Sequence, residues 1–183
     1  MENENMDSSN QSYWTSVLIG GLISALILAV LGLVSQYMTV GSEPTGSSFT
    51  LSQAIGTFAC LLGAVGGFIA TRHYAKEFDI SFTIGKGALI GLFTGLVAAV
   101  ISTLISLLWT SLIDPELNQA VYDWSIANLE AQNLTDDQFE MAKGFIPEPG
   151  ISAMTVGFGL IMLGILNAIS GLIGAKVFAS EED

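Results

Sequence analysis

The chain has 183 residues, of which 51% are hydrophobic and only 12% are charged, and 17 acidic against 5 basic residues give a formal net charge of −12. Soluble domains carry about twice this share of charged residues, and a disordered acidic chain would contain far fewer apolar residues. The composition therefore predicts an integral membrane protein, with the lipid bilayer as its first partner. Five basic residues cannot form the positive surface that nucleic-acid binding requires, so no nucleic-acid partner is expected.

Four apolar blocks have the length of a membrane span, at residues 17–34, 54–71, 84–113 and 151–175. The third block would form a helix of about 45 Å, so we expect it to tilt or protrude from a hydrocarbon core of about 30 Å. The predicted fold class is all-α, an integral membrane four-helix bundle with a short two-helix extramembrane cap between spans three and four. The expected organisation is an acidic tail at 1–16, spans one to three at 17–113, an acidic cap at 114–149, span four at 150–178 and an acidic tail at 179–183.

The few basic residues predict the orientation of the spans. If the connection between spans two and three is cytoplasmic, only Lys143 lies outside, because the cytoplasmic side then carries Arg72, Lys76, Lys86 and Lys176. Both termini would then be cytoplasmic and residues 114–149 would lie outside. The first span follows three acidic residues and no basic one, and no cleavage site closes it, so we interpret it as an uncleaved helix rather than a signal peptide.

Aromatic and basic residues flank the first two spans. Trp14 precedes the first span, and Arg72 and Lys76 follow the second, so these three side chains are expected to be interfacial anchors. His73, the only histidine, lies between the two basic residues. There we expect an interfacial or lipid-headgroup role for it rather than general-base chemistry.

The segment after the third span predicts two helices. Asp114 is expected to cap the first helix, with Pro115 in its first turn, and an apolar stripe that includes Trp124 favours packing over the ends of the bundle. Thr135 and Gln138 form a capping-box pattern for the second helix. Eight acidic residues and one lysine between 114 and 148 place seven of the twelve net negative charges in this cap.

Glycine recurs at four-residue spacing within the spans, where small residues let helices approach closely. We therefore predict a helix-packing interface made by Gly87, Gly91, Gly95, Gly63, Gly67, Gly164 and Gly171. The alternative is that these faces are flexible or line a pathway, but they lack the prolines that interrupt transporter helices.

No ionisable residue lies centrally in any span, which argues against a pump. Asn167 is the one strongly polar side chain at mid-span, and it is expected to make an interhelical hydrogen bond, with a substrate contact as the alternative. Cys60, the only cysteine, is expected to be a buried small hydrophobe. Two acidic residues four apart in the cap, Asp136 and Glu140, are weak evidence for a metal site, so no metal and no cofactor are predicted.

Four segments resemble a known family. They are the aromatic and basic end of span two at 72–76, the IGKGALIGLFTG entry to span three, the IDPEL turn at 113–117 and the glycine-rich last span ending LIGAKVF. Together they make the chain similar to the domain-of-unknown-function 4199 family of small four-span bacterial inner-membrane proteins. The resemblance implies topology and location in the bacterial inner membrane, and it implies no activity and no catalytic residues.

These observations favour a non-enzymatic structural or accessory subunit that associates with a membrane-protein partner, or with copies of itself, through glycine-rich helix faces. The alternative is a carrier or channel for a small solute, with Asn167 as a polar site and the acidic cap as an outer vestibule. An enzyme is the least favoured class, because the spans lack paired acid and base groups.

Overall fold

The computed structural model describes residues 12–150 and 153–178, and over these residues it contains helices and no strands. The helices are α1 (Trp14–Val40), α2 (Leu51–Gly63), α3 (Val65–Phe78), α4 (Ile84–Leu112), α5 (Leu117–Glu130), α6 (Asp136–Lys143) and α7 (Ala153–Phe178). Both acidic tails expected at the termini fall largely outside the described residues, as does the predicted start of span four at 151.

Four helical segments are long and apolar enough to cross a membrane: α1, α2 together with α3, α4, and α7, with 26 to 29 residues each. The prediction of an all-helical chain with four span-length helices is therefore confirmed. The second span differs from the expectation, because it is two helices that meet at Ala64 rather than one continuous helix.

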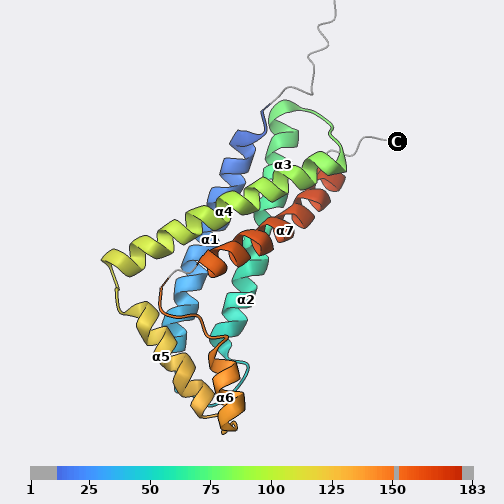
Figure 1. The fold of residues 1–183 in the computed structure, drawn as a ribbon. Coiled ribbons are helices and arrows are strands. Elements are labelled where there is room, and N and C mark those ends of the chain that lie inside the picture. The colour runs from blue at the N-terminus through green and yellow to red at the C-terminus, as the bar shows by residue number, and fades with distance from the viewer. Residues whose placement is uncertain (1–11, 151–152, 179–183) are drawn as a thin grey trace, which may run out of the picture.

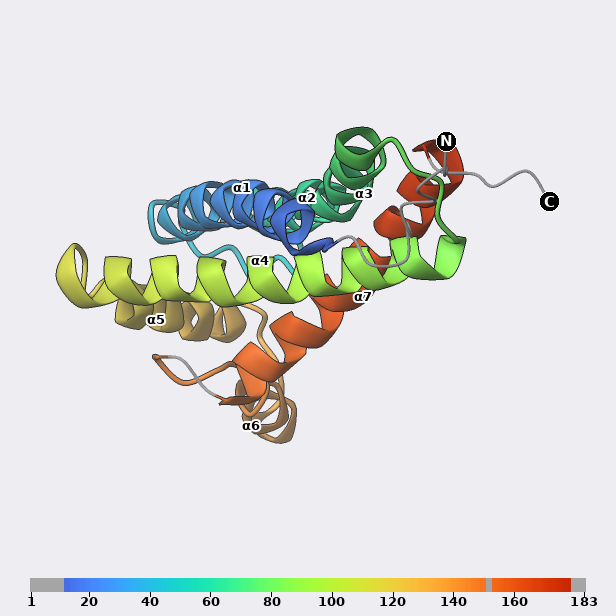
Figure 2. The same cartoon turned by 90° about the horizontal axis from the view of Figure 1, so that it is seen from above.

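The spans pack closely over only half of their length. α4 contacts α1, α3 and α7, and α3 packs in addition against α1 and α7, whereas α2 contacts mainly α1. Figure 1 shows α4 running obliquely across α1, with α7 alongside α4 near the α3–α4 connection. In Figure 2, seen from above, α1 and α4 lie in adjacent layers and α7 crosses α4. Apart from Ser52, Ala59 and Gly63 of α2 and Thr110 of α4, the buried residues of the spans lie at 16–25 of α1, 66–75 of α3, 87–99 of α4 and 163–175 of α7. We call these four segments the closed half.

The remaining span residues lie toward the cap and are more exposed. Within 26–40 of α1, 100–109 of α4 and 153–162 of α7 no described residue is fully buried. We call these three segments the open half. α2 packs mainly against α1, and grooves remain on both sides of α4 in this region.

The cap contains the two predicted helices, but its first helix begins differently from the expectation. Asp114 does not cap α5; the N-cap residue is Glu116, which makes no side-chain capping bond. The Asp114 carboxylate instead accepts a hydrogen bond of 2.8 Å from the Tyr37 hydroxyl, which in turn accepts one of 3.0 Å from the Trp109 indole N–H. This chain of bonds ties the end of α4 to the end of α1.

Two side chains of α5 fasten the cap to the connection between α1 and α2. Asn128 accepts hydrogen bonds from the backbone N–H groups of Thr45 and Gly46, at 3.1 and 3.0 Å, and the Trp124 indole donates to the Ser42 carbonyl at 2.7 Å. The amphipathic stripe therefore packs against this connection and the end of α1.

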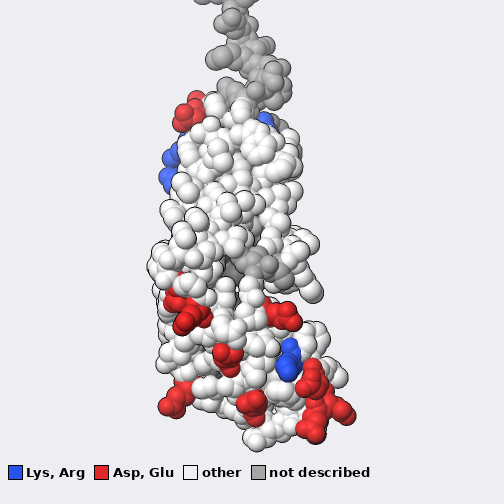
Figure 3. Space-filling model, turned by 60° about the vertical axis from the view of Figure 1, so that its left-hand side comes forward, with Lys and Arg blue, Asp and Glu red and all other residues white. Residues whose placement is uncertain are grey.

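The second cap helix follows its prediction, since the Thr135 N–H donates to the Gln138 side chain at 3.2 Å in a capping box and α6 ends before Gly144. Figure 3 shows acidic side chains gathered at the cap end of the molecule, and basic side chains mostly at the opposite end. The charge is thus polarised along the long axis of the molecule.

Candidate functional site

The break in the second span leaves backbone groups that an apolar environment must satisfy. α2 ends at Gly63 and α3 starts at Val65, while Ala64 keeps helical backbone angles and its N–H donates to the Cys60 carbonyl at 3.0 Å. The interruption is therefore local, and the backbone groups next to it need partners. Such breaks are tolerated inside membranes when a neighbouring helix supplies the missing hydrogen bonds. Here the neighbouring helix is α7.

Asn167 and Ser170 of α7 supply these bonds. The Asn167 carboxamide oxygen accepts from the Gly67 backbone N–H at 2.8 Å, in the first turn of α3. The Ser170 hydroxyl donates to the carbonyl of Ala64, the junction residue itself. One turn of α7 therefore caps the interrupted span from the side.

Both polar ends of Asn167 are engaged within the chain. Its amide nitrogen donates to the Leu163 carbonyl at 3.0 Å, and the side chain is completely buried. Asn167 does not line the two grooves beside α4 or the pocket on α3 that are described below. Its geometry is that of an interhelical hydrogen bond.

The predicted glycine stripe on α4 lies against α7. A Cβ atom at Gly91 or Gly95 would overlap the carbonyl oxygen of Asn167 or Leu163, respectively, and one at Gly87 would overlap the Cβ of Ala175. Gly171 meets the same contact from the α7 side, because its Cβ would lie 2.8 Å from the Cα of Gly91. The two backbones approach so closely that no side chain fits between them.

The other predicted glycines face different neighbours. Gly67 contacts α7, where an added Cβ would lie 2.6 Å from the Ser170 hydroxyl, and Gly63 faces the side chain of Leu28 on α1 at 2.8 Å. Gly164 is less tightly confined, since its nearest neighbour is the Leu92 side chain at 3.1 Å. All seven predicted positions therefore make contacts within this chain.

Three other glycines within the span helices have no such neighbour. Added Cβ atoms at Gly32 of α1 and at Gly157 and Gly159 of α7 would meet nothing within 4 Å. All three lie in the open half. The predicted packing glycines are thus covered by neighbouring helices, whereas these three glycines of the open half are not covered by any part of the described chain.

Two grooves flank α4 in the open half and share Ser102, Thr103 and Ser106 as lining. The groove toward α1 has a volume of about 210 Å³ and is completed by Leu28, Ala29, Gly32, Leu33 and Gln36. The groove toward α7 has a volume of about 220 Å³ and is completed by Ala99, Thr155, Val156, Gly159 and Leu163.

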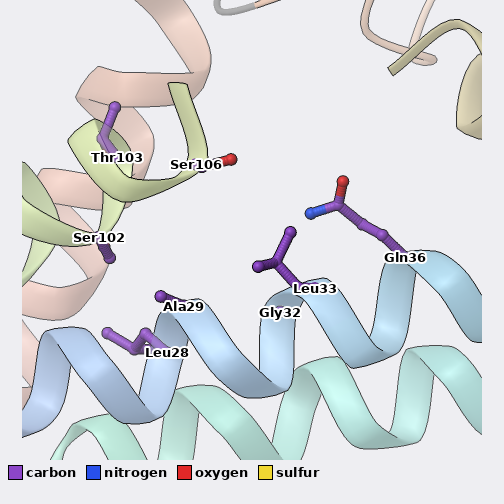
Figure 4. Close-up of a pocket in the computed structure, with 8 residues that line it drawn as sticks. All are labelled: Leu28, Ala29, Gly32, Leu33, Gln36, Ser102, Thr103 and Ser106. Carbon is purple, nitrogen blue, oxygen red and sulfur yellow. The ribbon is translucent and has the colours of Figure 1, made fainter. Parts of the chain in front are cut away.

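Polar atoms in the first groove have no partner in the described chain. Figure 4 shows the Ser106 hydroxyl and the Gln36 amide directed into the same space between α4 and α1. Among the described residues neither side chain makes a hydrogen bond, whereas the Ser102 hydroxyl bonds to the Ala99 carbonyl at 3.1 Å. Polar groups without partners on span-length helices favour association with another polar surface.

The sequence contained a signal for these grooves that the prediction missed. The four-residue repeat on α4 changes from glycine at 87, 91 and 95 to Ala99 and then to Thr103, with further hydroxyl residues at 102 and 106. Thr103 continues the four-residue spacing of the packing stripe but not its residue type. The change of residue type marks the point where α4 leaves α7.

The residues predicted as interfacial anchors lie on α1 and α3. Trp14 begins α1 and packs against Phe93 of α4, with ring centroids 5.2 Å apart. Arg72 and Lys76 are exposed on α3, and the Arg72 guanidinium lies 5.9 Å from the centroid of the Phe178 ring. His73 bonds to the buried Ser16 hydroxyl through Nδ1 at 2.9 Å.

Cys60 corrects a further expectation, because it is exposed rather than buried. It lies on α2, which contacts mainly α1 and leaves its other faces uncovered. Among the described residues no three His, Cys, Asp or Glu side chains gather as metal ligands would.

The comparisons with known proteins agree with the resemblance seen in the sequence. The family model described as "Protein of unknown function (DUF4199)" matches residues 20–177, and so covers all four spans and the cap. Neither the curated proteins nor the solved structures contain a match to the chain. The chain therefore belongs to the DUF4199 family, for which no function is assigned.

Proposed function

We propose that this protein is a non-enzymatic structural or accessory subunit of the bacterial inner membrane, which binds a transmembrane helix of a neighbouring subunit along the open half of α4. The observation that carries the proposal is the pair of grooves beside Ser102, Thr103 and Ser106. Both termini are cytoplasmic in this proposal and the cap lies outside, as the basic residues at the end opposite the cap favour.

The grooves have the chemistry of a helix-packing surface. Gly32 and Gly159 offer backbone that another helix can approach closely, and the Ser106 hydroxyl and the Gln36 amide offer hydrogen bonds. Small residues and interhelical hydrogen bonds are what drive helix association in lipid, where no hydrophobic force acts between helices. A neighbouring helix would cover the exposed glycine backbone and supply hydrogen-bond partners for the polar side chains.

The glycines of the closed half cannot serve this role, because contacts within the chain already occupy them. The proposed interface is therefore different from the predicted stripe at 87, 91 and 95, which is internal. The carrier alternative finds less support, since Asn167 is buried with both of its polar ends bonded.

Site-specific crosslinking in native membranes tests the proposal. Ser106→Cys in a Cys60→Ser background would place the only thiol in the groove, and we expect it to form a crosslinked product with a neighbouring subunit under mild oxidation or with a short bifunctional reagent. Thr94→Cys, in the closed half, is the buried control and is expected to form none. Leu61→Cys on the exposed face of α2 controls for random collision.

A product with a second copy or with a different polypeptide would each support the proposal, provided that the α2 control gives less of it. If Ser106→Cys gives no product, or no more than Leu61→Cys, the open half is not an association surface.

A further inference from the structure

A pocket lies on α3 at the end of the molecule opposite the cap. It has a volume of about 320 Å³ and is lined by Ile69, Arg72, His73, Lys76 and Glu77. Because these residues are three or four apart along one helix, they share a face. The face continues toward the middle of the span through Val65, which is 41% exposed.

The polarity of this face changes along the helix axis. Val65 and Ile69 are apolar, and the next turn brings a guanidinium, an imidazole and an ammonium group, followed by the end of α3 at Phe78. A surface that is apolar toward the middle of a span and cationic at its end matches a lipid, which has an acyl chain below and a phosphate above.

The two permanent cations of the pocket, Arg72 and Lys76, have no ion-pair partner in the part of the chain that the structure describes. Glu77 is the only acidic side chain in the lining. Lys86 is held elsewhere, with its ammonium group 4.9 Å from the centroid of the Tyr74 ring. The lining of the pocket thus contains two cationic side chains and one histidine but only one carboxylate, so positive charge is in excess there.

His73 is fixed in place for such a role. Its Nδ1 lies 2.9 Å from the hydroxyl of Ser16, which is completely buried on α1. A neutral imidazole that accepts the Ser16 hydrogen at Nδ1 carries its own hydrogen on Nε2 and can donate it to an anion. Contact between α1 and α3 therefore orients a third donor beside the two cations.

We propose that this pocket binds the phosphate headgroup of an anionic membrane lipid, with Arg72 and Lys76 contacting the phosphate, His73 donating a hydrogen bond and Ile69 contacting the glycerol or acyl portion. The apolar part of the face distinguishes a lipid from free phosphate, which would gain nothing from Ile69. This binding site is separate from the grooves of the open half.

Native mass spectrometry of the full chain in mild detergent with added phosphatidylglycerol tests the proposal. We expect one phosphatidylglycerol to bind saturably, and more tightly than phosphatidylcholine. Arg72→Gln and Lys76→Gln should each weaken binding about fivefold, which corresponds to the roughly 1 kcal/mol that one basic residue contributes near an anionic surface. The double variant should weaken it by about 25-fold.

Two matched variants control for diffuse attraction by net charge. Lys176→Gln removes a basic residue at the end of α7 that does not line the pocket, and Lys143→Gln removes one in the cap. Both are expected to change the affinity less than twofold. If Lys176→Gln weakens binding as much as Lys76→Gln does, there is no defined site.

Competition with inorganic phosphate separates the two sources of the anion. Millimolar phosphate should not displace the lipid, and Ile69→Gln should weaken phosphatidylglycerol binding. Displacement by phosphate, or an affinity that is unchanged in Ile69→Gln, would overturn the lipid assignment. Arg72 and Lys76 are exposed, so both substitutions should leave the fold intact, which the thermal unfolding temperature of each variant checks.

Discussion

The closed and open halves of the spans contain the same kinds of residue, glycine and uncharged polar side chains, which make different contacts in the two halves. In the closed half, Gly91 and Gly171 bring α4 and α7 into backbone contact, and Asn167 hydrogen-bonds to a neighbouring helix. In the open half, Gly159 faces empty space and Gln36 has no hydrogen-bond partner among the described residues. Composition alone would not distinguish these two regions.

The difference arises from the paths of the helices. α3 packs against α7 and α4, but its continuation, α2, follows α1 instead. Where α3 gives way to α2 at Ala64, Asn167 and Ser170 of α7 hydrogen-bond to the junction. Beyond that turn α7 no longer packs closely against this span.

The largest effect is expected from adding bulk to the closed half. Gly91→Leu would force a side chain into the Asn167 backbone, and we expect it to lower the free energy of unfolding by about 3 kcal/mol or to prevent folding. Gly159→Leu is the matched control in the open half, where removing a helical glycine should leave stability unchanged or raise it by about 0.5–1 kcal/mol. Thermal unfolding in detergent measures both, and equal losses would contradict the division into two halves.

A smaller loss is expected when the bonds at the span junction are removed. Asn167→Leu leaves the Gly67 N–H without its acceptor, and we expect a loss of about 1–2 kcal/mol. Ser102→Ala removes a hydroxyl from the open half and should cost less than about 0.5 kcal/mol. Hydrogen exchange at Gly67 is a local readout, and unchanged protection in Asn167→Leu would show that the amide does not cap α3.

The groove side chains should affect association and leave the monomer almost unchanged. Replacing both Gln36 and Ser106 by Leu removes two unpartnered polar groups, so the unfolding free energy should move by less than about 0.5 kcal/mol. The crosslinked product from a Thr103→Cys probe in a Cys60→Ser background should fall severalfold in this double variant. An unchanged crosslinking yield would show that Gln36 and Ser106 do not contribute to association.

The smallest effect is expected at Ser24. Its hydroxyl is completely buried beside Gly66 and makes no hydrogen bond within the described chain. Ser24→Ala therefore removes no bond and should change stability by less than about 0.5 kcal/mol. Thermal unfolding tests this, and a loss comparable to that of Asn167→Leu would show that the hydroxyl has a partner in the folded protein.

The sequence predicted the spans and the second cap helix well, because both depend on local signals. Uninterrupted apolar length defined the spans, and the Thr135–Gln138 pair defined α6. The Ala64 junction was not predicted, although Gly63, Gly66 and Gly67 flank it, because glycines at this spacing also suit close helix packing. The groups that stabilise the junction come from a helix about 100 residues later.

The candidate site was predictable only in part. Four-residue glycine spacing indicated close helix approach, but which helix each glycine meets depends on the crossing of α4 with α1 and α7. Asp114 illustrates the same limit, because its sequence context suits an N-cap while Tyr37, from a distant helix, binds its carboxylate. The neighbours of the glycines and the partner of Asp114 are therefore determined by tertiary contacts, which local sequence patterns do not specify.

The central claim is that the open half is the association surface, and the size of the protein complex in native-lipid nanodiscs tests it most directly. We predict that the wild-type protein is larger than a monomer of 19.3 kDa, that Gly32→Leu with Gly159→Leu reduces it to a folded monomer, and that Cys60→Leu on α2 leaves the size unchanged. A monomeric wild type with no associated partner, or a filled groove that leaves the complex intact, would contradict the claim.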